Sequence, residues 1–348
     1  MKINSVKTIK VTASKSYQVI IGSGILGGTG ERLLEILPKC KIAVITDDRV
    51  DKLYSKTLIT SLENSGYQTI KFVFKAGEES KNLNTYGEIL AFLAENGMTR
   101  TDAIVALGGG VVGDMAGFAS ATYMRGIKYV QIPTTLLAQI DSSVGGKTAV
   151  DLPQGKNLVG AFCQPSLVLC DVDTLKTLPK EVYLEGMGEG VKYAVLDKDV
   201  YKILSGNYDI EEFVYSCIDY KRRIVEADEF EGGKRKLLNF GHTPAHGIEK
   251  LSEFKIPHGN AVAMGVKIML ENSLRLGYID KEQTIELVSL IEKVIGKVDC
   301  PYKIEEVMKE ALMDKKRSGD TISIMMAFGI GDVREIKVKI DEIGEYVK

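Results

Sequence analysis

The chain has 348 residues, of which 45% are hydrophobic and 26% charged, a composition typical of a globular protein with room for two domains. Lysine and arginine together number 45 against 47 aspartates and glutamates, which excludes a general attraction to nucleic acid or to an anionic membrane, so any anion site must be local. The five cysteines are scattered and form no Cys-x-x-Cys pair, which predicts reduced thiols in a cytosolic protein. No apolar stretch predicts a secretion signal or a membrane span.

The first half of the chain alternates short apolar runs with stretches of helical spacing. Residues 6–11 and 17–21 alternate between apolar and polar side chains and predict a β-hairpin. Further strands are expected at 41–46, 69–74, 102–107 and 128–132, and helices at 51–65 and 85–96. Strands that alternate with helices predict a parallel α/β sheet.

The second half of the chain has mostly helical periodicity. After about Leu178 the apolar residues follow a series of amphipathic helices, and strand patterns return only near 321–328 and 333–340. We therefore expect an α/β N-terminal domain with a Rossmann-like parallel sheet over residues 1–178. A mainly α-helical C-terminal domain is expected over residues 179–348.

Two segments match the dinucleotide-binding pattern G-x-G-x-x-G. Gly22–Gly27 follows the second hairpin strand, with Asp47 about twenty residues further on, where a ribose-binding acid is expected. Gly108–Gly113 joins a strongly apolar strand to a helix expected to start at Val111, where backbone N–H groups can face a phosphate. We favour the second segment as the pyrophosphate loop and interpret Gly22–Gly27 as a connection between hairpin and helix.

Residues 144–148, Val-Gly-Gly-Lys-Thr, look like the end of a phosphate-binding P-loop. That motif needs a glycine where Asp141 stands, so a P-loop kinase is excluded. The remaining signal is an acid and two lysines, Asp141, Lys147 and Lys156, which flexible turns are expected to bring together. The neighbouring glycines allow close approach to a ligand.

All three histidines of the chain, His242, His246 and His258, fall within seventeen residues. His242 and His246 are four apart and would share one face of a helix, and Pro244 requires that this helix begin near His242. Two histidines from neighbouring helices and one distant carboxylate would form a catalytic zinc site with an open position. Spacing alone leaves open which two histidines are ligands.

Five motifs together resemble the 3-dehydroquinate synthase family. They occur in the family's order, and the resemblance runs from about Ala43 to Lys316. The motifs are Gly-Gly-Gly-Val-Val-Gly-Asp at 108–114, residues 132–148, Gly-Lys-Asn-Leu-Val-Gly at 155–160, Met-Gly-Glu-Gly-Val-Lys-Tyr at 187–193 and Leu-Asn-Phe-Gly-His at 238–242.

The resemblance implies an activity and its cofactors. Family members convert 3-deoxy-D-arabino-heptulosonate 7-phosphate to 3-dehydroquinate and phosphate in the shikimate pathway, which leads to chorismate and the aromatic amino acids. NAD is used catalytically, taking a hydride and returning it, and a zinc or cobalt ion polarises the oxidised centre. The resemblance further implies a cytoplasmic homodimer that acts on a small sugar phosphate. Neither nucleic acid nor membrane is expected as a partner.

The resemblance also assigns residues to four groups. The metal ligands fall on Glu189, His242 and His258, in the helical domain. The NAD contacts fall in the α/β domain, on Asp47, Glu78, Lys81, Gly109, Gly110, Val111, Asp114, Thr134, Thr135, Lys156, Thr174 and Thr177. The substrate contacts fall on Arg125, Asp141, Lys147, Asn157, Lys192, Lys221, Arg235, Asn239, His246 and Lys316 or its neighbour Lys315. Catalytic roles fall on Lys147, Lys192, Glu231, Arg235, Asn239 and His246.

The sequence departs from the family pattern around the metal glutamate. Gly188 and Gly190 flank Glu189, where the family commonly has alanine and a β-branched residue, and two glycines are expected to loosen a helix start. Related cyclases that form 2-deoxy-scyllo-inosose or valiolone rings, metal-dependent polyol dehydrogenases and an inactive binding homologue are the alternatives. Arg235, Asn239, Lys221 and Lys147 together favour the dehydroquinate reaction.

Overall fold

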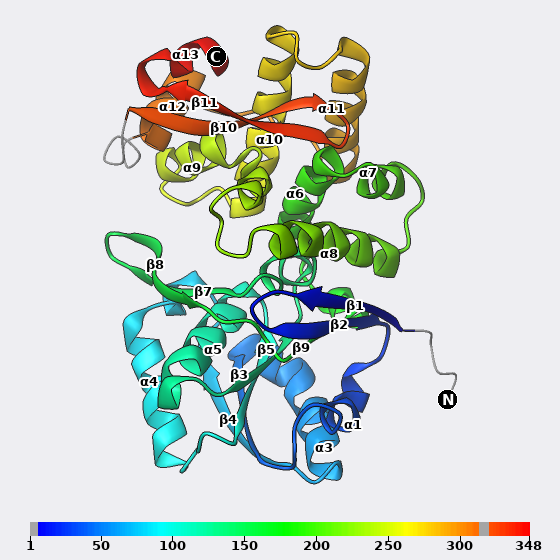
Figure 1. The fold of residues 1–348 in the computed structure, drawn as a ribbon, viewed down its shortest axis with the longest axis vertical. Helices are drawn as coiled ribbons and strands as arrows, with labels where there is room; N and C mark the ends of the chain where they lie inside the picture. Colours follow the sequence, from blue (N-terminus) through cyan, green and yellow to red (C-terminus); the bar gives the residue numbers. More distant parts are fainter. Residues whose placement is uncertain (1–5, 313–319) are drawn as a thin grey trace. The chain divides into compact units, whose positions relative to one another are not determined.

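The computed structural model describes residues 6–312 and 320–348, and its contacts divide the chain into two compact units (Figure 1). The first unit comprises the residues up to Leu178 together with 221–229, and the second comprises 179–220 and 230–348. Helix α8 (Ile210–Ala227) therefore contributes residues to both units.

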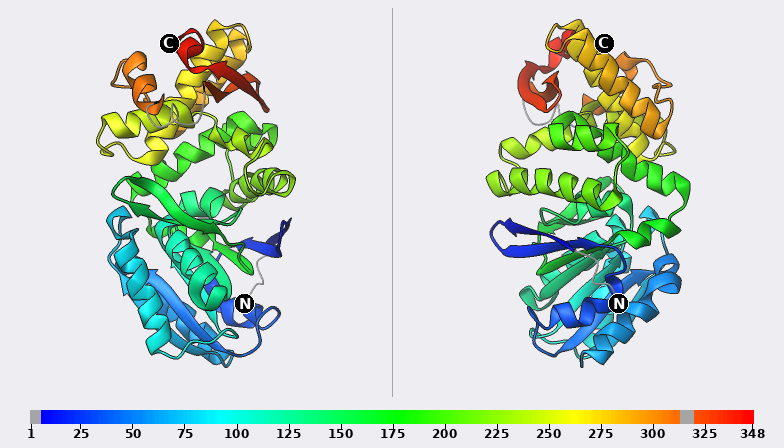
Figure 2. Two further views of the ribbon diagram at one scale, coloured as in Figure 1. Left: turned by 60° about the vertical axis from the view of Figure 1, so that its left-hand side comes forward. Right: turned by 90° about the vertical axis from the view of Figure 1, so that its right-hand side faces the viewer.

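A seven-stranded sheet forms the centre of the first unit, in the order β1-β2-β9-β6-β5-β3-β4. Strands β1 and β2 pair antiparallel at one edge, as the dark blue hairpin in Figure 2, and the other pairs are parallel. The predicted hairpin and parallel sheet are thus confirmed. The strands are β1 (Lys7–Thr12), β2 (Ser16–Gly22), β3 (Lys41–Asp47), β4 (Gln68–Phe74), β5 (Ala103–Gly108), β6 (Lys128–Pro133) and β9 (Leu167–Asp171).

Helices cover both faces of this sheet (Figure 1), because successive residues of a buried strand point to opposite sides. In β3, Ile42 and Val44 join one apolar cluster, and Ala43 and Ile45 join the other. The first cluster contains residues of α1 (Thr29–Leu33) and α3 (Lys56–Asn64), and the second contains residues of α4 (Leu83–Glu95) and α5 (Gly110–Thr122).

The strand order reverses between β3 and β5. From β3 the chain continues to β4 on one side, and from β5 it continues to β6 on the other. In open α/β sheets, the carboxyl ends of the strands that flank such a switch point border the ligand-binding crevice. The residues that follow β3 and β5 are therefore candidates for binding a ligand.

Lys147 and Lys156 lie in strands, so the expectation of flexible turns around them is wrong. Strand β7 (Lys147–Leu152) pairs antiparallel with β8 (Gly155–Phe162) in a separate hairpin, which puts Lys147 opposite Phe162. Val150 is fully buried in the apolar cluster beside α5, and this burial stabilises a hairpin whose glycines and charges hide its strand pattern. Strand β9, between β2 and β6, was also not expected.

The second unit is mainly helical. Helix α10 (His258–Arg275) contacts α6 (Lys180–Leu196), α9 (His242–Leu251) and α11 (Lys281–Ile295), and it also contacts strand β10 (Thr321–Gly329). Strand β10 pairs with β11 (Asp332–Lys339), as the sequence predicts. Helices α7 (Lys198–Ser205), α12 (Ile304–Leu312) and α13 (Ile343–Tyr346) also belong to the described part of this unit. This arrangement confirms the predicted fold class.

Among residues 6–312 and 320–348, no helix has the length and apolar character needed to cross a membrane.

Candidate functional site

Glu189, His242 and His258 form a cluster in the second unit whose ligand atoms all lie within 4.8 Å of one another. Oε1 of Glu189 lies 3.1 Å from Nε2 of His258 and 3.4 Å from Nε2 of His242. The glutamate comes from the middle of α6, and the two histidines are the first residues of α9 and α10. Residues far apart in the sequence therefore converge on one point.

The local sequence explains why both histidines begin helices. Gly241, which precedes α9, has a left-handed backbone with φ of 79°, a conformation that favours glycine. Pro244 lies in the first turn of α9, where its missing N–H is tolerated, so the prediction that this helix begins at His242 is confirmed. Pro257 directly precedes α10 and ends the preceding connection.

Gly188 lies in the interior of α6, so the expected loosening of a helix start is wrong. A Cβ at Gly188 would overlap the backbone of Gly259, and a Cβ at Gly259 would overlap the backbone of Glu185. Helices α6 and α10 thus approach backbone to backbone, one residue away from Glu189 and from His258. The glycines bring these two side chains together.

The cluster is strongly charged although its glutamate is buried. Glu189 is only 2% exposed, and it pairs with the ammonium group of Lys192, which is 1% exposed. Burial would raise the pKa of the Glu189 carboxyl, but Lys192 and then His242 hold it well below its usual range. Burial would lower the pKa of His258, but hydrogen bonds with Glu189 and Glu249 raise it to about 10.

Two imidazole nitrogens and one carboxylate oxygen are a donor set suited to zinc or cobalt, with a further position left for a bound molecule. The three side chains already converge, so the residues present fit such an ion. The structure thus brings together the three side chains that the sequence predicts as ligands.

The other predicted residues of the second unit differ in burial. Arg235 is buried, whereas Asn239 is exposed and donates from Nδ2 to Oε1 of Glu231 at 2.9 Å. His246 is exposed on α9, and its ring centroid lies 5.8 Å from that of His242. Lys316 and Lys315 lie outside the described residues.

The predicted cofactor residues of the first unit follow the carboxyl ends of parallel strands. Asp47 is the last residue of β3, and its Oδ1 accepts from the backbone N–H groups of Arg49 and Val50 at 2.9 Å. Gly109 and Gly110 follow β5, and the latter begins α5. Val111 is on the first turn of α5, Thr134 and Thr135 follow β6, and Thr174 and Thr177 follow β9. Because these strands are parallel, all of these residues lie at one edge of the sheet.

This edge has features suited to a dinucleotide. A Cβ at Gly109 would approach Thr135 to 2.9 Å, so the glycine leaves the start of α5 open to close approach. The hydroxyl of Thr134 is buried and has no hydrogen-bond partner among the described residues. A free hydroxyl and the N-terminus of a helix fit the phosphate and ribose groups of NAD.

Lys81 is the centre of a second charged group at this edge. Its Nζ lies 2.6 Å from Oδ2 of Asp114 and donates to Oδ1 of Asn157 at 2.5 Å. Burial would lower the pKa of Lys81, but the neighbouring Asp114 carboxylate raises it. Burial raises the pKa of Asp114 to about 6, although Lys81 acts to lower it. Nearby, Lys156 lies 3.9 Å from Glu78. The predicted substrate residue Asn157 thus contacts the predicted cofactor residue Lys81, which in turn pairs with Asp114.

Asp141 and Lys221 form a further ion pair in the first unit. The Nζ of Lys221 contacts the Asp141 carboxylate and donates to its backbone carbonyl at 2.7 Å. Lys147 and Arg125, by contrast, are exposed, and Arg125 has a positive φ of 66°. The structure therefore pairs two of the predicted substrate residues of this unit directly.

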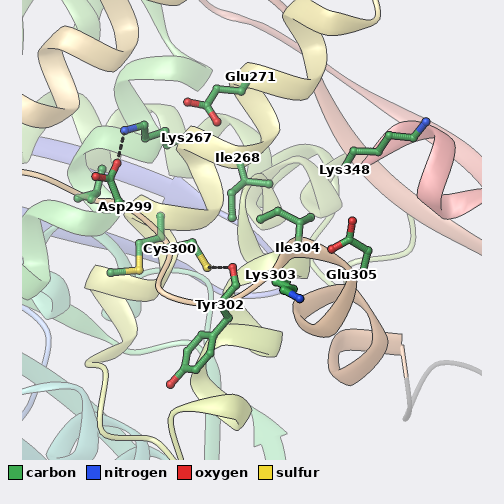
Figure 3. A pocket seen from close by; sticks show the side chains of 12 residues that line it. Lys267, Ile268, Glu271, Asp299, Cys300, Tyr302, Lys303, Ile304, Glu305 and Lys348 are labelled. Carbon is green, nitrogen blue, oxygen red and sulfur yellow. Dashed lines mark hydrogen bonds and ion pairs between the residues drawn. The ribbon is translucent and has the colours of Figure 1, made fainter.

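The cavity in Figure 3 belongs to a different part of the second unit. It has a volume of about 390 Å³ and is lined by part of α10, by most of residues 298–305 and by Lys348. Its Lys267 donates to Glu292 at 3.0 Å and to Asp299 at 2.8 Å. No predicted site residue within the described ranges lines this cavity.

Glu249 contacts the metal cluster through His258, and the sequence reasoning missed it. Its Oε1 lies 3.2 Å from Nδ1 of His258. The available signal was its spacing, seven residues after His242 and three after His246, which places all three on one face of a helix.

Comparison with known proteins identifies the family. The profile described as 3-dehydroquinate synthase N-terminal matches residues 71–185, and the profile described as 3-dehydroquinate synthase C-terminal matches residues 186–317. The chain belongs to the 3-dehydroquinate synthase family. A 3-dehydroquinate synthase of Clostridium acetobutylicum is 44% identical in an alignment of 357 positions, which covers 98% of this chain and 99% of the relative.

Two solved cyclase structures show the same fold at 25% identity, each with a TM-score of 0.85. One is 2-deoxy-scyllo-inosose synthase complexed with carbaglucose-6-phosphate, NAD⁺ and Co²⁺, which covers 98% of this chain and 100% of its own. The other is 2-epi-5-epi-valiolone synthase from Streptomyces hygroscopicus with NAD⁺ and Zn²⁺ bound, which covers 97% of both chains.

Proposed function

We propose that this member of the 3-dehydroquinate synthase family is itself a 3-dehydroquinate synthase, a phosphate-eliminating lyase that uses NAD and a divalent metal ion. It converts 3-deoxy-D-arabino-heptulosonate 7-phosphate to 3-dehydroquinate and phosphate. The observation that carries the proposal is the convergence of Glu189, His242 and His258 beside the buried Lys192, in a chain 44% identical to a named synthase.

Each cofactor has a defined part in this proposal. Bound zinc or cobalt supplies a Lewis acid at a substrate oxygen, held by Glu189, His242 and His258. Bound NAD supplies a temporary hydride acceptor, so the reaction has no net redox change; the residues at the carboxyl ends of β3, β5, β6 and β9 hold it.

The chain's own residues bind and orient an anionic substrate. Lys192 and Arg235 are buried cations in the second unit, and a buried cation strongly favours a carboxylate or phosphate. Lys147 and Arg125 supply exposed cations in the first unit. His246, exposed on the face of α9 that also carries His242, is suited to proton transfer because an imidazole titrates near neutral pH.

The assembly and the location belong to the same proposal. We propose a cytoplasmic homodimer, supported by the family and, for the location, by five cysteines that are all present as thiols and not as disulfides.

The decisive experiment measures phosphate release from the heptulosonate phosphate with catalytic NAD and zinc, while NADH absorbance and dehydroquinate are followed. We expect phosphate and dehydroquinate in equal amounts with no accumulated NADH. Phosphate release only from a six-carbon sugar phosphate would identify an inosose-type cyclase instead. Steady NADH formation from a simple polyol would identify a dehydrogenase.

A further inference from the structure

Glu249 is a buried carboxylate on α9 that none of the groups above contains. Its side chain is 8% exposed, and Oε1 lies 3.2 Å from Nδ1 of His258. A buried carboxylate is costly unless it is paired, so its place beside one ring nitrogen of a metal-cluster histidine needs an explanation.

The contact determines how the His258 ring is presented. An ionised carboxylate can only accept a hydrogen bond, so the proton of this contact lies on Nδ1. The opposite nitrogen, Nε2, lies 3.1 Å from Oε1 of Glu189, on the side of the cluster. Glu249 thus selects the tautomer and the ring orientation in which Nε2 is available as a ligand.

His242 provides a comparison within the same cluster. Its Nδ1 lies 3.3 Å from the carbonyl oxygen of Phe240, and its Nε2 faces Glu189 at 3.4 Å. Both histidines are therefore held through Nδ1. Only His258 is held by a side chain, so only its support can be removed by a substitution that leaves the backbone unchanged.

We propose that Glu249 is a positioning residue for the metal site: it accepts the Nδ1 hydrogen of His258 and holds Nε2 toward the ion. The inference rests on the metal site of the proposed function, and it adds a residue that acts through His258. A carboxylate acceptor also makes the imidazole a more basic ligand. Loss of such a partner typically weakens metal binding about 10- to 100-fold.

The test is a zinc titration of metal-free protein in competition with a chromophoric chelator, without substrate. Glu249→Gln keeps the size of the side chain but removes its charge, and we expect its dissociation constant for zinc to rise about 10- to 100-fold. Glu249→Asp keeps the charge on a shorter side chain, and its affinity for zinc should lie between those of the wild type and Glu249→Gln. Glu271→Gln, an exposed glutamate on the same helix as His258, is the matched control and should bind as the wild type does.

Two further readouts separate positioning from a purely structural role. The visible spectrum of the cobalt-loaded Glu249→Gln protein should differ from that of the wild type, because one ligand is held differently. A variant with wild-type zinc affinity and an unchanged cobalt spectrum would overturn the inference, even if its metal-free melting temperature fell. A wild-type protein that binds no zinc would instead overturn the proposed metal site itself.

Discussion

Lys192 is a buried cation that pairs with a buried carboxylate. At 1% exposure it pairs with Glu189, which is 2% exposed, so each charge stabilises the other. The pair explains how Glu189 stays ionised in spite of its burial, as a metal ligand must. In the proposed function, this lysine therefore stabilises the second unit and also binds the anionic substrate.

We expect Lys192→Met to destabilise the metal-free protein by about 3 kcal/mol, because it leaves the buried Glu189 carboxylate without its lysine partner. Added zinc should restore part of this loss by supplying positive charge, while turnover stays abolished because the substrate has lost a cation. Urea denaturation with and without zinc measures both effects. Lys202→Met, an exposed lysine of α7, should change neither; equal stability of the two variants would contradict the prediction.

Asp102 gives the first unit a defined dependence on pH. Burial would raise the pKa of its carboxyl, but hydrogen bonds from Thr99 and Lys41 lower it. Because the folded-state pKa lies below the unfolded-state pKa of about 3.9, the stabilisation is complete well above pH 3.9 and is lost as pH falls through the folded-state pKa.

Asp102→Asn should therefore destabilise the protein by about 2 kcal/mol at neutral pH, where the backbone and hydroxyl donors lose an ionised acceptor. The loss should be smaller at about pH 3, below the unfolded-state pKa, where the ionised carboxylate stabilises the folded state less. Urea denaturation at the two pH values measures the difference. Glu88→Gln, an exposed change on α4, serves as the control. A destabilisation that stayed constant across this range would show that the charge of Asp102 is not the cause.

At the scale of elements, the crossing of α6 and α10 determines the geometry of the metal cluster. The helices meet at Gly188 and Gly259, where neither position has room for a Cβ, and each glycine adjoins a predicted ligand. Close packing of this kind cannot absorb an extra methyl group without a shift of one helix.

We expect Gly188→Ala to destabilise the protein by about 1–3 kcal/mol and to weaken zinc binding, because it separates Glu189 from His258. Gly87→Ala on α4, where no atom lies near the added methyl group, should instead stabilise by about 0.5–1 kcal/mol. Thermal unfolding and zinc titration of both variants make the comparison. Unchanged zinc affinity in Gly188→Ala would mean that the helix crossing does not control ligand geometry.

The elements also show what the sequence could and could not predict. Buried strands such as Lys41–Asp47 have apolar runs that need no tertiary information, and Pro244 located the start of α9 correctly. The β7–β8 hairpin was missed because its glycines and lysines read as turns, although Val150 is fully buried.

Contacts that join distant segments are equally difficult to predict. The histidine cluster stood out because His242 and His258 are close in sequence, whereas their common partner Glu189 was assigned only by the family resemblance. The Glu249 contact was not predicted at all, because glutamates are common on helix surfaces and nothing in the sequence marks this one as buried.

At the scale of the whole molecule, the two units are not two consecutive pieces of chain. Residues 221–229 pack with the first unit, although the chain has meanwhile entered the second at Pro179. Glu226 accepts from the backbone N–H of Thr12 at 2.7 Å, and Glu229 accepts from that of Ser14 at 2.6 Å. The N-terminal hairpin is thus held by residues more than two hundred positions later.

This connectivity limits the order in which the protein can fold while it is being synthesised. Domains generally fold as units on the ribosome, the N-terminal one first. Here the first unit cannot obtain the partners of Thr12, Ser14 and Asp141 until residues 221–229 have left the exit tunnel, by which time all of α6 and α7 have also emerged. A nascent chain arrested after Leu178 should therefore be more sensitive to protease in its N-terminal hairpin than one arrested well beyond Glu229.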